Sequence, residues 1–376
     1  MNVAMVIRPD AGLRPGGDVV QAEKTAEALR RTGVRVRLGS GEGMSDADVV
    51  HIFNLQTPAW TLAQVRAAQR LHKPIVLSPI YWSRHRLLLG AAAQFPRVLP
   101  HLLAAGTART ARGVHPRVTP LLPLGQRRDL RAIVNGCHLL LPNSSVEGDL
   151  LRAEFPELRK RMDAMPVVPN GVDVQAWERN KSQSRVVDEL GVPDEYALCV
   201  ARIEFRKNQL WLIRAAAQLR LPLVLVGDPV QSSFWHRAYY QACKAARKPV
   251  IFLGHRPQET LWPLYARCKV HCLPSYFETP GLSNLEAALA GTRLVTTAYG
   301  STQEYFGRWA TYCEPTSVRS IAHAIVRTLE SAPPGELQRV VRERYDWTRV
   351  AEATSRAYVL ALEREGAAGS TFSTAS

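Results

Sequence analysis

Short apolar runs alternate with longer segments of helical periodicity from the first residues of the chain onward. Runs of β-branched residues predict buried strands, and apolar positions spaced three or four residues apart predict the helices between them. Such alternation is typical of a parallel sheet whose strands are joined by crossover helices. In the first half of the chain, strands are predicted at Val3–Ile7, Val34–Leu38, Val49–Phe53, Ile75–Ile80 and His138–Pro142.

The first predicted crossover helix is Asp18–Arg31, which follows Pro15-Gly16-Gly17 and ends before Gly33. Glycine and proline mark the ends of helices, and an apolar stripe marks the face that packs on a sheet. The apolar or small positions on this face are Val19, Ala22, Ala26 and Leu29. The opening segment therefore predicts a βαβ unit.

A second alternating series follows the polar loop that ends near Asp194 and predicts a second α/β domain. Its strands are predicted at Ala197–Ala201, Leu223–Gly227, Val250–Gly254, Val270–Pro274 and Leu294–Thr297. A chain of 376 residues is also long for a single hydrophobic core. The polar stretch Glu178–Ser184 has the composition of a domain connector, so we predict domains at 1–175 and 176–347. A last helix is predicted at Thr348–Leu362, followed by a disordered tail, Gly366–Ser376.

The segment Trp82–Arg128 interrupts the first series. It is rich in arginine and leucine, and its prolines are Pro96, Pro100, Pro116, Pro120 and Pro123. Neither a regular strand nor a regular helix follows from this composition. We therefore predict an insertion into the first domain with a function of its own.

Charge and cysteine usage restrict the classes of protein that fit. Lys and Arg exceed Asp and Glu by 48 − 33 = 15, which gives a pI near 9.9 and favours a polyanionic partner. No apolar run has the length of a transmembrane helix and the first ten residues lack a leader pattern, so we expect a cytoplasmic protein. The six cysteines form no CxxC pair and are expected to be reduced. Cys268, His271 and Cys272 lie in an apolar run, which indicates core packing rather than a metal site.

The segment Arg202–Asn208 carries the first candidate chemistry, because it follows a predicted strand and precedes a helix. Arg202 and Lys207 are therefore expected on exposed loop positions at the carboxyl edge of the second sheet, where α/β proteins bind ligands. Two cations there fit a diphosphate and would offset the charge that develops on a leaving nucleotide. An ordinary basic loop on a basic protein is the alternative.

A predicted strand-to-helix turn at Ser275–Ala287 carries Glu278, Gly281 and Glu286. Gly281 permits close approach of the backbone to a ligand. The first amides of the following helix, together with the helix dipole, favour an anion such as phosphate. Ser283 and Glu286 also match a capping box, in which the glutamate only bonds the start of its own helix, and this alternative stays open.

The ordered set of motifs resembles the retaining glycosyltransferases of family four. The similarity runs through Val168–Asp173, the Arg202 and Lys207 segment, Leu225–Asp228, Phe252–Gly254, the Glu278 and Glu286 pair, Ala290-Gly291 and Glu304. Each string is short, but their order and spacing are specific and cover most of the predicted second domain. The resemblance implies the GT-B fold, an α/β architecture of two facing Rossmann-like domains with a cleft between them. It also implies that the last helix, 348–365, packs back on the first domain.

The resemblance assigns roles to the charged positions. Arg202 and Lys207 would bind the diphosphate, Glu286 would bind the ribose hydroxyls, and Glu278 would lie beside the donor sugar. Arg202, Lys207 and Glu278 are therefore the expected catalytic residues.

Further donor-binding positions follow from the same resemblance. Gly254 and His255 would lie near the base, although a solvated loop histidine is an equal alternative for His255. The remaining expected donor-binding residues are Gly16, Gly17, Gly281, Leu282 and Ser283.

The first half of the chain matches the family less closely. Gly16-Gly17 and Asp48–His51 resemble the acceptor domain of the family, but the glycine spacing is no dinucleotide fingerprint. Many relatives carry a histidine after the fourth strand that helps to bind the transferring sugar, and no histidine of Ser78–His85 falls clearly in register. The candidates there are Tyr81, Trp82 and His85, with packing favoured for the two aromatic residues.

The resemblance implies a retaining hexosyltransferase that moves a sugar from a nucleotide diphosphate-sugar to a saccharide or lipid-linked acceptor. Because no protein nucleophile is evident, catalysis would come from positioning and from stabilisation of the leaving group, without a metal or another cofactor. The arginine-rich insertion suits an anionic or lipid-linked acceptor and peripheral contact with the anionic inner face of a membrane, a solvated loop being the alternative. No nucleic-acid partner is expected.

Two other classes of protein share parts of this pattern. A non-catalytic nucleotide-sugar or polyanion-binding protein of the same fold is the main alternative, since a fold does not prove activity. A nucleotide-sugar epimerase fits less well, because such an enzyme needs more acid–base groups.

Overall fold

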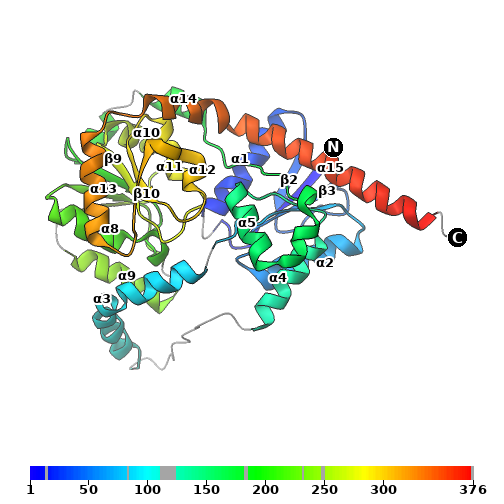
Figure 1. Cartoon of the computed structure of the whole chain (residues 1–376), viewed down its shortest axis with the longest axis horizontal. Coiled ribbons are helices and arrows are strands. Elements are labelled where there is room, and N and C mark those ends of the chain that lie inside the picture. The colour runs from blue at the N-terminus through cyan, green and yellow to red at the C-terminus, as the bar shows by residue number, and fades with distance from the viewer. Residues whose placement is uncertain are drawn as a thin grey trace. The chain divides into compact units, whose positions relative to one another are not determined.

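The computed structural model describes residues 1–12, 16–82, 84–110, 124–181, 185–230, 233–246 and 250–373. The chain divides into two compact units. Unit 1 comprises Met1–Trp82, Pro120–Gly171 and Arg344–Ser376, and unit 2 comprises Ser83–Thr119 and Val172–Glu343. Each unit contains one parallel sheet with helices packed on it (Figure 1).

The sheet of unit 1 has the strand order β2-β1-β3-β4-β5, and all its neighbours are parallel. Its strands are β1 (Asn2–Val6), β2 (Arg35–Gly39), β3 (Val49–Phe53), β4 (Ile75–Ser78) and β5 (Leu139–Leu140). Its helices are α1 (Gly17–Arg31), α2 (Pro58–Arg70), α4 (Leu124–Gly136), α5 (Ser145–Glu154), η1 (Pro156–Lys160), η2 (Met162–Ala164) and α15 (Trp347–Ser373). The five strands predicted for the first half are confirmed, with small shifts at their ends.

Helix α1 buries the face that its sequence pattern predicts, including Val19, Ala22, Ala26 and Leu29. Helix α15 belongs to unit 1, where it packs along α1 (Figure 1). The prediction of a disordered tail from Gly366 is wrong for residues 366–373, because α15 continues through Ser373.

The sheet of unit 2 has the order β11-β10-β9-β6-β7-β8 and is also parallel throughout. Its strands are β6 (Ala197–Val200), β7 (Leu223–Val226), β8 (Val250–Gly254), β9 (Val270–Leu273), β10 (Leu294–Thr297) and β11 (Ala310–Cys313). Its helices are α3 (Arg84–Thr110), α6 (Val174–Asn180), α7 (Arg185–Glu189), η3 (Phe205–Lys207), α8 (Gln209–Gln218), α9 (Phe234–Ala245), α10 (Gln258–Arg267), α11 (Leu282–Leu289), α12 (Thr302–Phe306), η4 (Gly307–Trp309), α13 (Val318–Glu330) and α14 (Gly335–Arg344). The five strands predicted here are confirmed, and β11 was not predicted.

The core of unit 2 lies between its sheet and the helices on either side. Helices α8 and α13 pack together, as do α10 and α11 (Figure 1). All six cysteines are buried without disulfides. Cys272 and His271 of β9 are fully buried, which confirms core packing for this run. Within the described ranges, no helix combines the length and the hydrophobicity that crossing a membrane requires.

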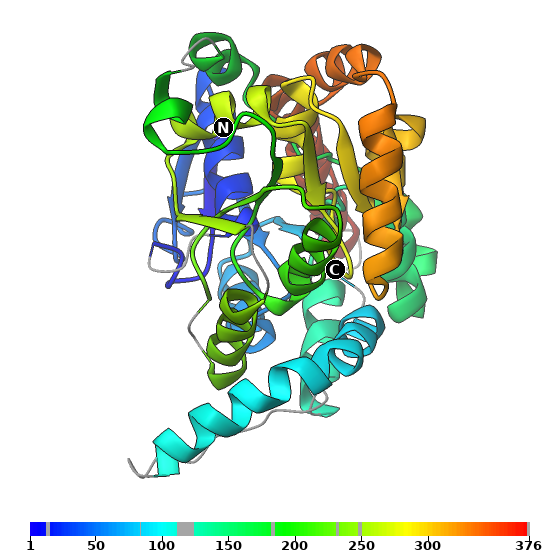
Figure 2. The ribbon, with the colours of Figure 1, turned by 90° about the vertical axis from the view of Figure 1, so that its left-hand side faces the viewer.

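The predicted insertion is largely a long helix, α3, and it belongs to unit 2 rather than to the first domain. It lies side by side with α9 (Figures 1 and 2). Gly90 makes close packing possible, because a Cβ at this position would overlap the ring of Tyr276. Val98 and Leu102 of α3 are part of the core of unit 2. The positions Arg112, Pro116, Pro120 and Pro123 lie outside the described residues.

Candidate active site

In the sheet of unit 2, the chain continues in opposite directions from the two adjacent strands β6 and β9. The chain runs outward from β6 to β8 on one side and from β9 to β11 on the other. At such a switch point the loops after two adjacent parallel strands separate and leave room for a ligand. The loop after β6 carries Arg202 and Lys207, and the loop after β9 carries Glu278 and Gly281.

Lys207 and Glu278 meet across this switch point. The Nζ atom of Lys207 lies 2.6 Å from Oε2 of Glu278, and the Oγ atom of Ser275 donates to the same oxygen over 2.8 Å. The side chains are only 12% and 4% exposed, respectively. The expectation that Lys207 occupies an exposed loop position is therefore wrong, because its partner is buried 71 residues further along the chain.

Arg206 also connects the loop after β6 with the loop after β9. The sequence patterns did not single it out. Its Nη2 atom lies 3.0 Å from Oε1 of Glu204, and its Nη1 atom lies 3.8 Å from Oε1 of Glu278. Its carbonyl oxygen also accepts a hydrogen bond from the amide of Tyr276. Arg202 is more open, with 39% of its side chain exposed and its Nη2 atom 3.7 Å from Oε2 of Glu204.

The two carboxylates of this cluster are held in their charged form. Burial raises the pKa of Glu278, but Lys207 and Arg206 outweigh it and keep this pKa below the ordinary value. Burial likewise opposes ionisation of Glu204, and the cations Arg206, Arg202 and Lys207 lower its pKa. The cluster therefore contains three cations and two carboxylates, which leaves one net positive charge for an anionic ligand.

The first turn of α11 faces the same edge of the sheet. Gly281 is its N-cap with φ of 89°, and a Cβ there would lie 2.9 Å from the side chain of Leu273 and 3.1 Å from that of Glu278. No side chain caps the helix at this position, so the first amides, those of Leu282 and Ser283, point out of the helix end. The capping-box alternative is wrong, because Ser283 lies inside the helix.

Glu286 is fixed by two other side chains instead. Its Oε1 accepts from the amide of Gln258 over 2.7 Å, and its Oε2 accepts from the hydroxyl of Tyr265 over 2.7 Å. Both partners lie on α10 and were missed, since nothing in the sequence links that helix to the glutamate. A carboxylate has further lone pairs, so Glu286 can accept additional hydrogen bonds from a ligand.

Gly254 ends β8, and His255 follows it at the same edge of the sheet. Gly254 has φ of 68°, which suits glycine, and its carbonyl accepts from the amide of Gly227. The amide of His255 donates to Oδ1 of Asp228 over 2.9 Å, while its side chain is exposed. Asp228 thus holds the turn after β8, and the imidazole of His255 is left at the surface.

Gly16 and Gly17 lie in unit 1, at the end of α1 that follows β1. Apart from its chain neighbours and its own helix backbone, no described residue has an atom within 4 Å of a Cβ at Gly17, so packing against those residues gives no reason for a glycine there. Beside it, Oδ2 of Asp18 accepts from Nε of Arg8 over 2.9 Å and from the amide of Asn54 over 2.8 Å. These residues follow β1 and β3, which are neighbours at the switch point of the first sheet.

The candidates for a sugar-binding residue in the first half differ in how deeply they are buried. Tyr81 is buried with its ring edge-on to Phe155, so it packs in the core of unit 1. Trp82 is only partly buried, and the side chain of His85 lies outside the described part of the chain. His51 is fully buried between Ser78 and Tyr358, with hydrogen bonds of 2.9 and 2.8 Å. Burial lowers its pKa to about 3, so it stays neutral.

A polar contact ties α3 to these loops and was also missed. The amide of buried Gln94 donates to the hydroxyl of Tyr276 over 2.6 Å and to the side chain of Asn208. Asn208 directly follows Lys207 and has φ of 61°, and its own amide donates to the carbonyls of Pro274 and Pro315. Gln94 therefore contacts both loops that carry the Lys207 and Glu278 pair.

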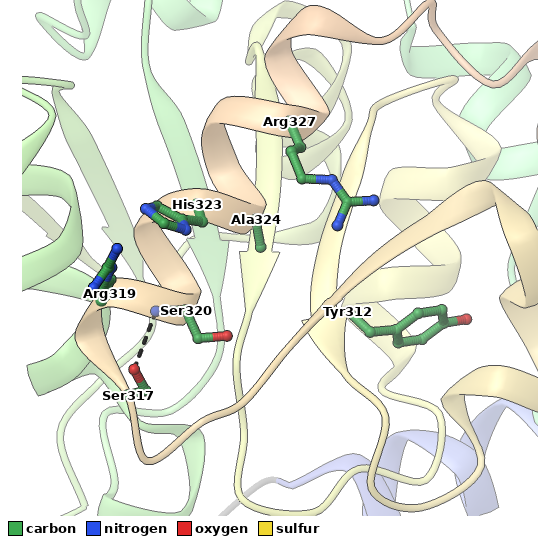
Figure 3. A pocket seen from close by; sticks show the side chains of 7 residues that line it. All are labelled: Tyr312, Ser317, Arg319, Ser320, His323, Ala324 and Arg327. Atoms are coloured by element: carbon green, nitrogen blue, oxygen red, sulfur yellow. Dashed lines mark hydrogen bonds between the residues drawn. The ribbon is translucent and has the colours of Figure 1, made fainter.

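A surface depression in unit 2 lies apart from these residues. It has a volume of about 470 Å³ and follows the exposed side of α13 (Figure 3). Its lining residues are Tyr312, Ser317, Arg319, Ser320, His323, Ala324 and Arg327. None of the predicted site residues is among them. Among the described residues, no three side chains of His, Cys, Asp or Glu are grouped as metal ligands would be.

Comparison with protein families matches residues 180–345 to the glycosyl transferases group 1. An uncharacterized glycosyltransferase of Methanocaldococcus jannaschii is 29% identical over 223 residues, which is 54% of this chain and 56% of that protein. The chain thus spans about half the length of this relative. A D-inositol 3-phosphate glycosyltransferase of Stackebrandtia nassauensis is 28% identical over 356 residues, covering 88% of this chain and 77% of the relative.

Solved structures of similar fold cover nearly the whole chain. Sucrose-phosphate synthase of Thermosynechococcus elongatus superimposes with a TM-score of 0.71 at 16% identity, over 96% of this chain and 98% of that structure. Anabaena HepE in complex with UDP and glucose gives a TM-score of 0.67 at 16% identity, over 95% and 98%. The fold is therefore GT-B, and residues 180–345 match the family model of the glycosyl transferases group 1.

Proposed function

We propose that this chain is a retaining hexosyltransferase whose donor, a nucleotide diphosphate-sugar, binds at the carboxyl edge of the sheet in unit 2. The observation that carries the proposal is the 2.6 Å contact between Lys207 and Glu278 at the switch point. Arg202 and Arg206 lie beside this pair. Neighbouring cations at a sheet edge suit a diphosphate, which carries two or more negative charges.

The arrangement supports stabilisation of the leaving group. Glu204 and Glu278 hold Arg206 and Lys207 in place before any ligand arrives, so little reorganisation accompanies binding. When the glycosidic bond breaks, negative charge grows on the nucleotide diphosphate. Arg202, which is the most exposed of the three cations, is placed to meet that charge. The amides at the start of α11 can add hydrogen bonds to a phosphate oxygen.

The nucleoside would be held by the residues of the neighbouring loops. Glu286, oriented by Gln258 and Tyr265, offers a fixed carboxylate to the two ribose hydroxyls. The turn at Gly254 and His255 would accommodate the base. The similar structure of Anabaena HepE contains UDP and glucose, which supports a nucleotide and a sugar as the donor components.

Retention of configuration is part of the proposal. Glu278 accepts hydrogen bonds from Lys207 and Ser275 and is almost fully buried, which suits a positioning role more than that of a nucleophile. The cations at the sheet edge can supply the charge compensation that a divalent ion gives in other transferases, so we propose a reaction without a metal cofactor.

The acceptor is proposed to be a saccharide or a lipid-linked molecule, bound with the help of unit 1. The open space at Gly17 and the fixed Arg8, Asp18 and Asn54 cluster support a polar ligand at that sheet edge. A binding protein without turnover remains the second candidate, because no residue of the first half has been assigned to bind the transferring sugar.

Product analysis tests the proposal. The chain is incubated with nucleotide diphosphate-sugars that stabilise it against heat, together with a mixture of glycoside and lipid-linked acceptors. We expect a new glycoside with the anomeric configuration of the donor and one free nucleoside diphosphate for each sugar transferred. An inverted product would contradict retention. Tight donor binding without turnover would establish the binding protein instead.

A further inference from the structure

Helix α3 presents two unlike faces. One face, with Gly90, Gln94, Val98 and Leu102, is fixed to unit 2 through Tyr276 and the core. The opposite side carries large apolar side chains at helical spacing. Leu88, Leu89 and Leu103 are 51%, 57% and 63% exposed. Helices of soluble proteins normally place polar residues on their solvent side, so this apolar stripe needs a partner.

The apolar stripe continues onto the neighbouring helix. Phe95 of α3 packs against Trp235 of α9 with ring centroids 5.9 Å apart, and both rings are partly exposed. Figure 2 shows α3, in cyan, beside α9. A tryptophan next to exposed leucines is typical of surfaces that enter the boundary between water and lipid, because the indole is apolar with one polar N–H.

The charges of helix α3 itself have a single sign. Helix α3 contains four arginines and no acidic residue, and no Asp or Glu occurs anywhere in residues 49–128. Arg97 lies over the ring of Trp211 at 4.5 Å, and Arg214 lies over the same ring at 5.4 Å. No carboxylate pairs with either arginine in the part of the chain that the structure describes. An anionic surface would relieve the repulsion between these guanidinium groups.

We propose that the α3 stripe, defined by Leu88, Leu89, Phe95, Leu103 and Trp235, docks the protein on a lipid bilayer that contains anionic headgroups. The leucines and the aromatic rings enter the headgroup region, while the arginines contact lipid phosphates. A second protein copy offers the wrong chemistry, because the same arginines would then approach each other across the interface. Helix α3 also holds Gln94, so the docked surface lies on the element that contacts the donor loops.

Vesicle co-sedimentation tests this inference on the full chain, with vesicles of phosphatidylcholine alone or mixed with phosphatidylglycerol. We expect binding to the anionic vesicles, weakened by salt, and little binding to the neutral ones. The double variant Leu89→Gln/Leu103→Gln should bind at least about tenfold more weakly, since it removes two inserted side chains. Both positions are exposed, so thermal stability should not change.

A matched control uses Leu71→Gln/Leu362→Gln, which alters two exposed leucines of unit 1 outside the stripe. This control should bind vesicles like the wild type. Quenching of tryptophan fluorescence by brominated lipid gives a local readout, and Trp235→Phe should remove most of it. Neither measurement needs a donor or an acceptor, so the result is separate from that of the glycosyltransferase assay.

Three results would overturn the inference. In the first, the wild type does not bind anionic vesicles. In the second, the stripe variant Leu89→Gln/Leu103→Gln binds them as strongly as the control variant does. In the third case the wild type is a dimer that the stripe variant dissociates, with no binding to lipid, and the stripe is then a surface for self-association.

Discussion

Lys207 and Glu278 neutralise each other inside the protein, with Nζ and Oε2 2.6 Å apart and both side chains largely removed from water. A buried ion pair gives little net stability, but loss of one partner leaves the other charge uncompensated. Arg206, at 3.8 Å, offsets only part of the charge of Glu278. The ion pair therefore affects both the stability of unit 2 and the proposed reaction.

Replacing the lysine should consequently destabilise the fold as well as the reaction. We expect Lys207→Ala to lower the free energy of unfolding by about 3 kcal/mol, because Glu278 stays buried without its closest cation. Urea unfolding measures this loss. The double variant Lys207→Met/Glu278→Leu should recover most of the stability without recovering turnover. If Lys207→Ala is as stable as the wild type, the ion pair of Lys207 and Glu278 is not buried in solution.

Buried histidines make the chain sensitive to mild acid. Burial lowers the pKa of His51 and that of His271 to about 3, from the ordinary 6.5. The unfolded chain takes up protons below pH 6.5 while the folded chain does not, so stability falls as the pH drops from 6.5 toward 3. At pH 5 each histidine should cost about 2 kcal/mol relative to neutral pH.

The measurement is the free energy of unfolding as a function of pH in the wild type and in His51→Gln. The variant loses hydrogen bonds to Ser78 and Tyr358 and is less stable at neutral pH. Its decline between pH 6.5 and pH 5 should nevertheless be shallower by about 2 kcal/mol, because one buried titrating group is gone. Parallel curves would contradict a neutral, buried His51.

Glu286 distinguishes ribose binding from a structural role. Glu286→Gln keeps an acceptor for the hydroxyl of Tyr265, so the fold should tolerate it. Loss of a charged acceptor for the ribose hydroxyls should raise the KM for the donor about tenfold or more. Tyr265→Phe is the control, since it removes one of the hydrogen bonds that orient Glu286 but leaves the carboxylate. If the two variants change the KM equally, Glu286 does not bind the ribose.

The surroundings of Glu286 in the structure also illustrate which features the sequence predicts and which it does not. Strand positions and the motifs at strand ends are predictable, because burial and helix or strand periodicity leave a local pattern. The capping-box alternative would have placed the start of α11 at Ser283, whereas the helix begins after Gly281, which has a positive φ. The role of Tyr265 depends on the packing of α10 against α11, which has no local pattern.

The same distinction explains the errors on Lys207 and on α3. The exposure of Lys207 depends on a carboxylate 71 residues away. Helix α3 follows unit 1 in the chain, yet the space at Gly90 and the hydrogen bonds of Gln94 join it to unit 2. The burial of Lys207 and the placement of α3 both depend on contacts between segments that lie far apart in the sequence. The local composition of either segment does not show such contacts.

Gly17 offers a test of ligand approach in unit 1. It is the first residue of α1, and an added methyl group would meet no atom of the described residues within 4 Å beyond its chain neighbours and its own helix backbone. We expect Gly17→Ala to change stability by less than about 0.5 kcal/mol. It should lower kcat/KM about tenfold, because the methyl group occupies space that a substrate uses.

Gly335→Ala serves as the control for this change, since Gly335 also begins a helix and has open space around its Cα. Stability should again be preserved, and activity should be normal. Full activity in Gly17→Ala would mean that no substrate approaches that sheet edge.

The rate of sugar transfer in Arg202→Ala tests the central account most directly. Arg202 is the most exposed cation of the cluster, so its loss should leave stability within about 0.5 kcal/mol of the wild type. If it stabilises the leaving diphosphate, kcat/KM should fall by about a hundredfold to a thousandfold. Arg319→Ala, an exposed arginine of the α13 depression, is the matched control and should retain normal rates. Near-normal transfer by Arg202→Ala, or an equal loss in Arg319→Ala, would contradict a donor site at the switch point of unit 2.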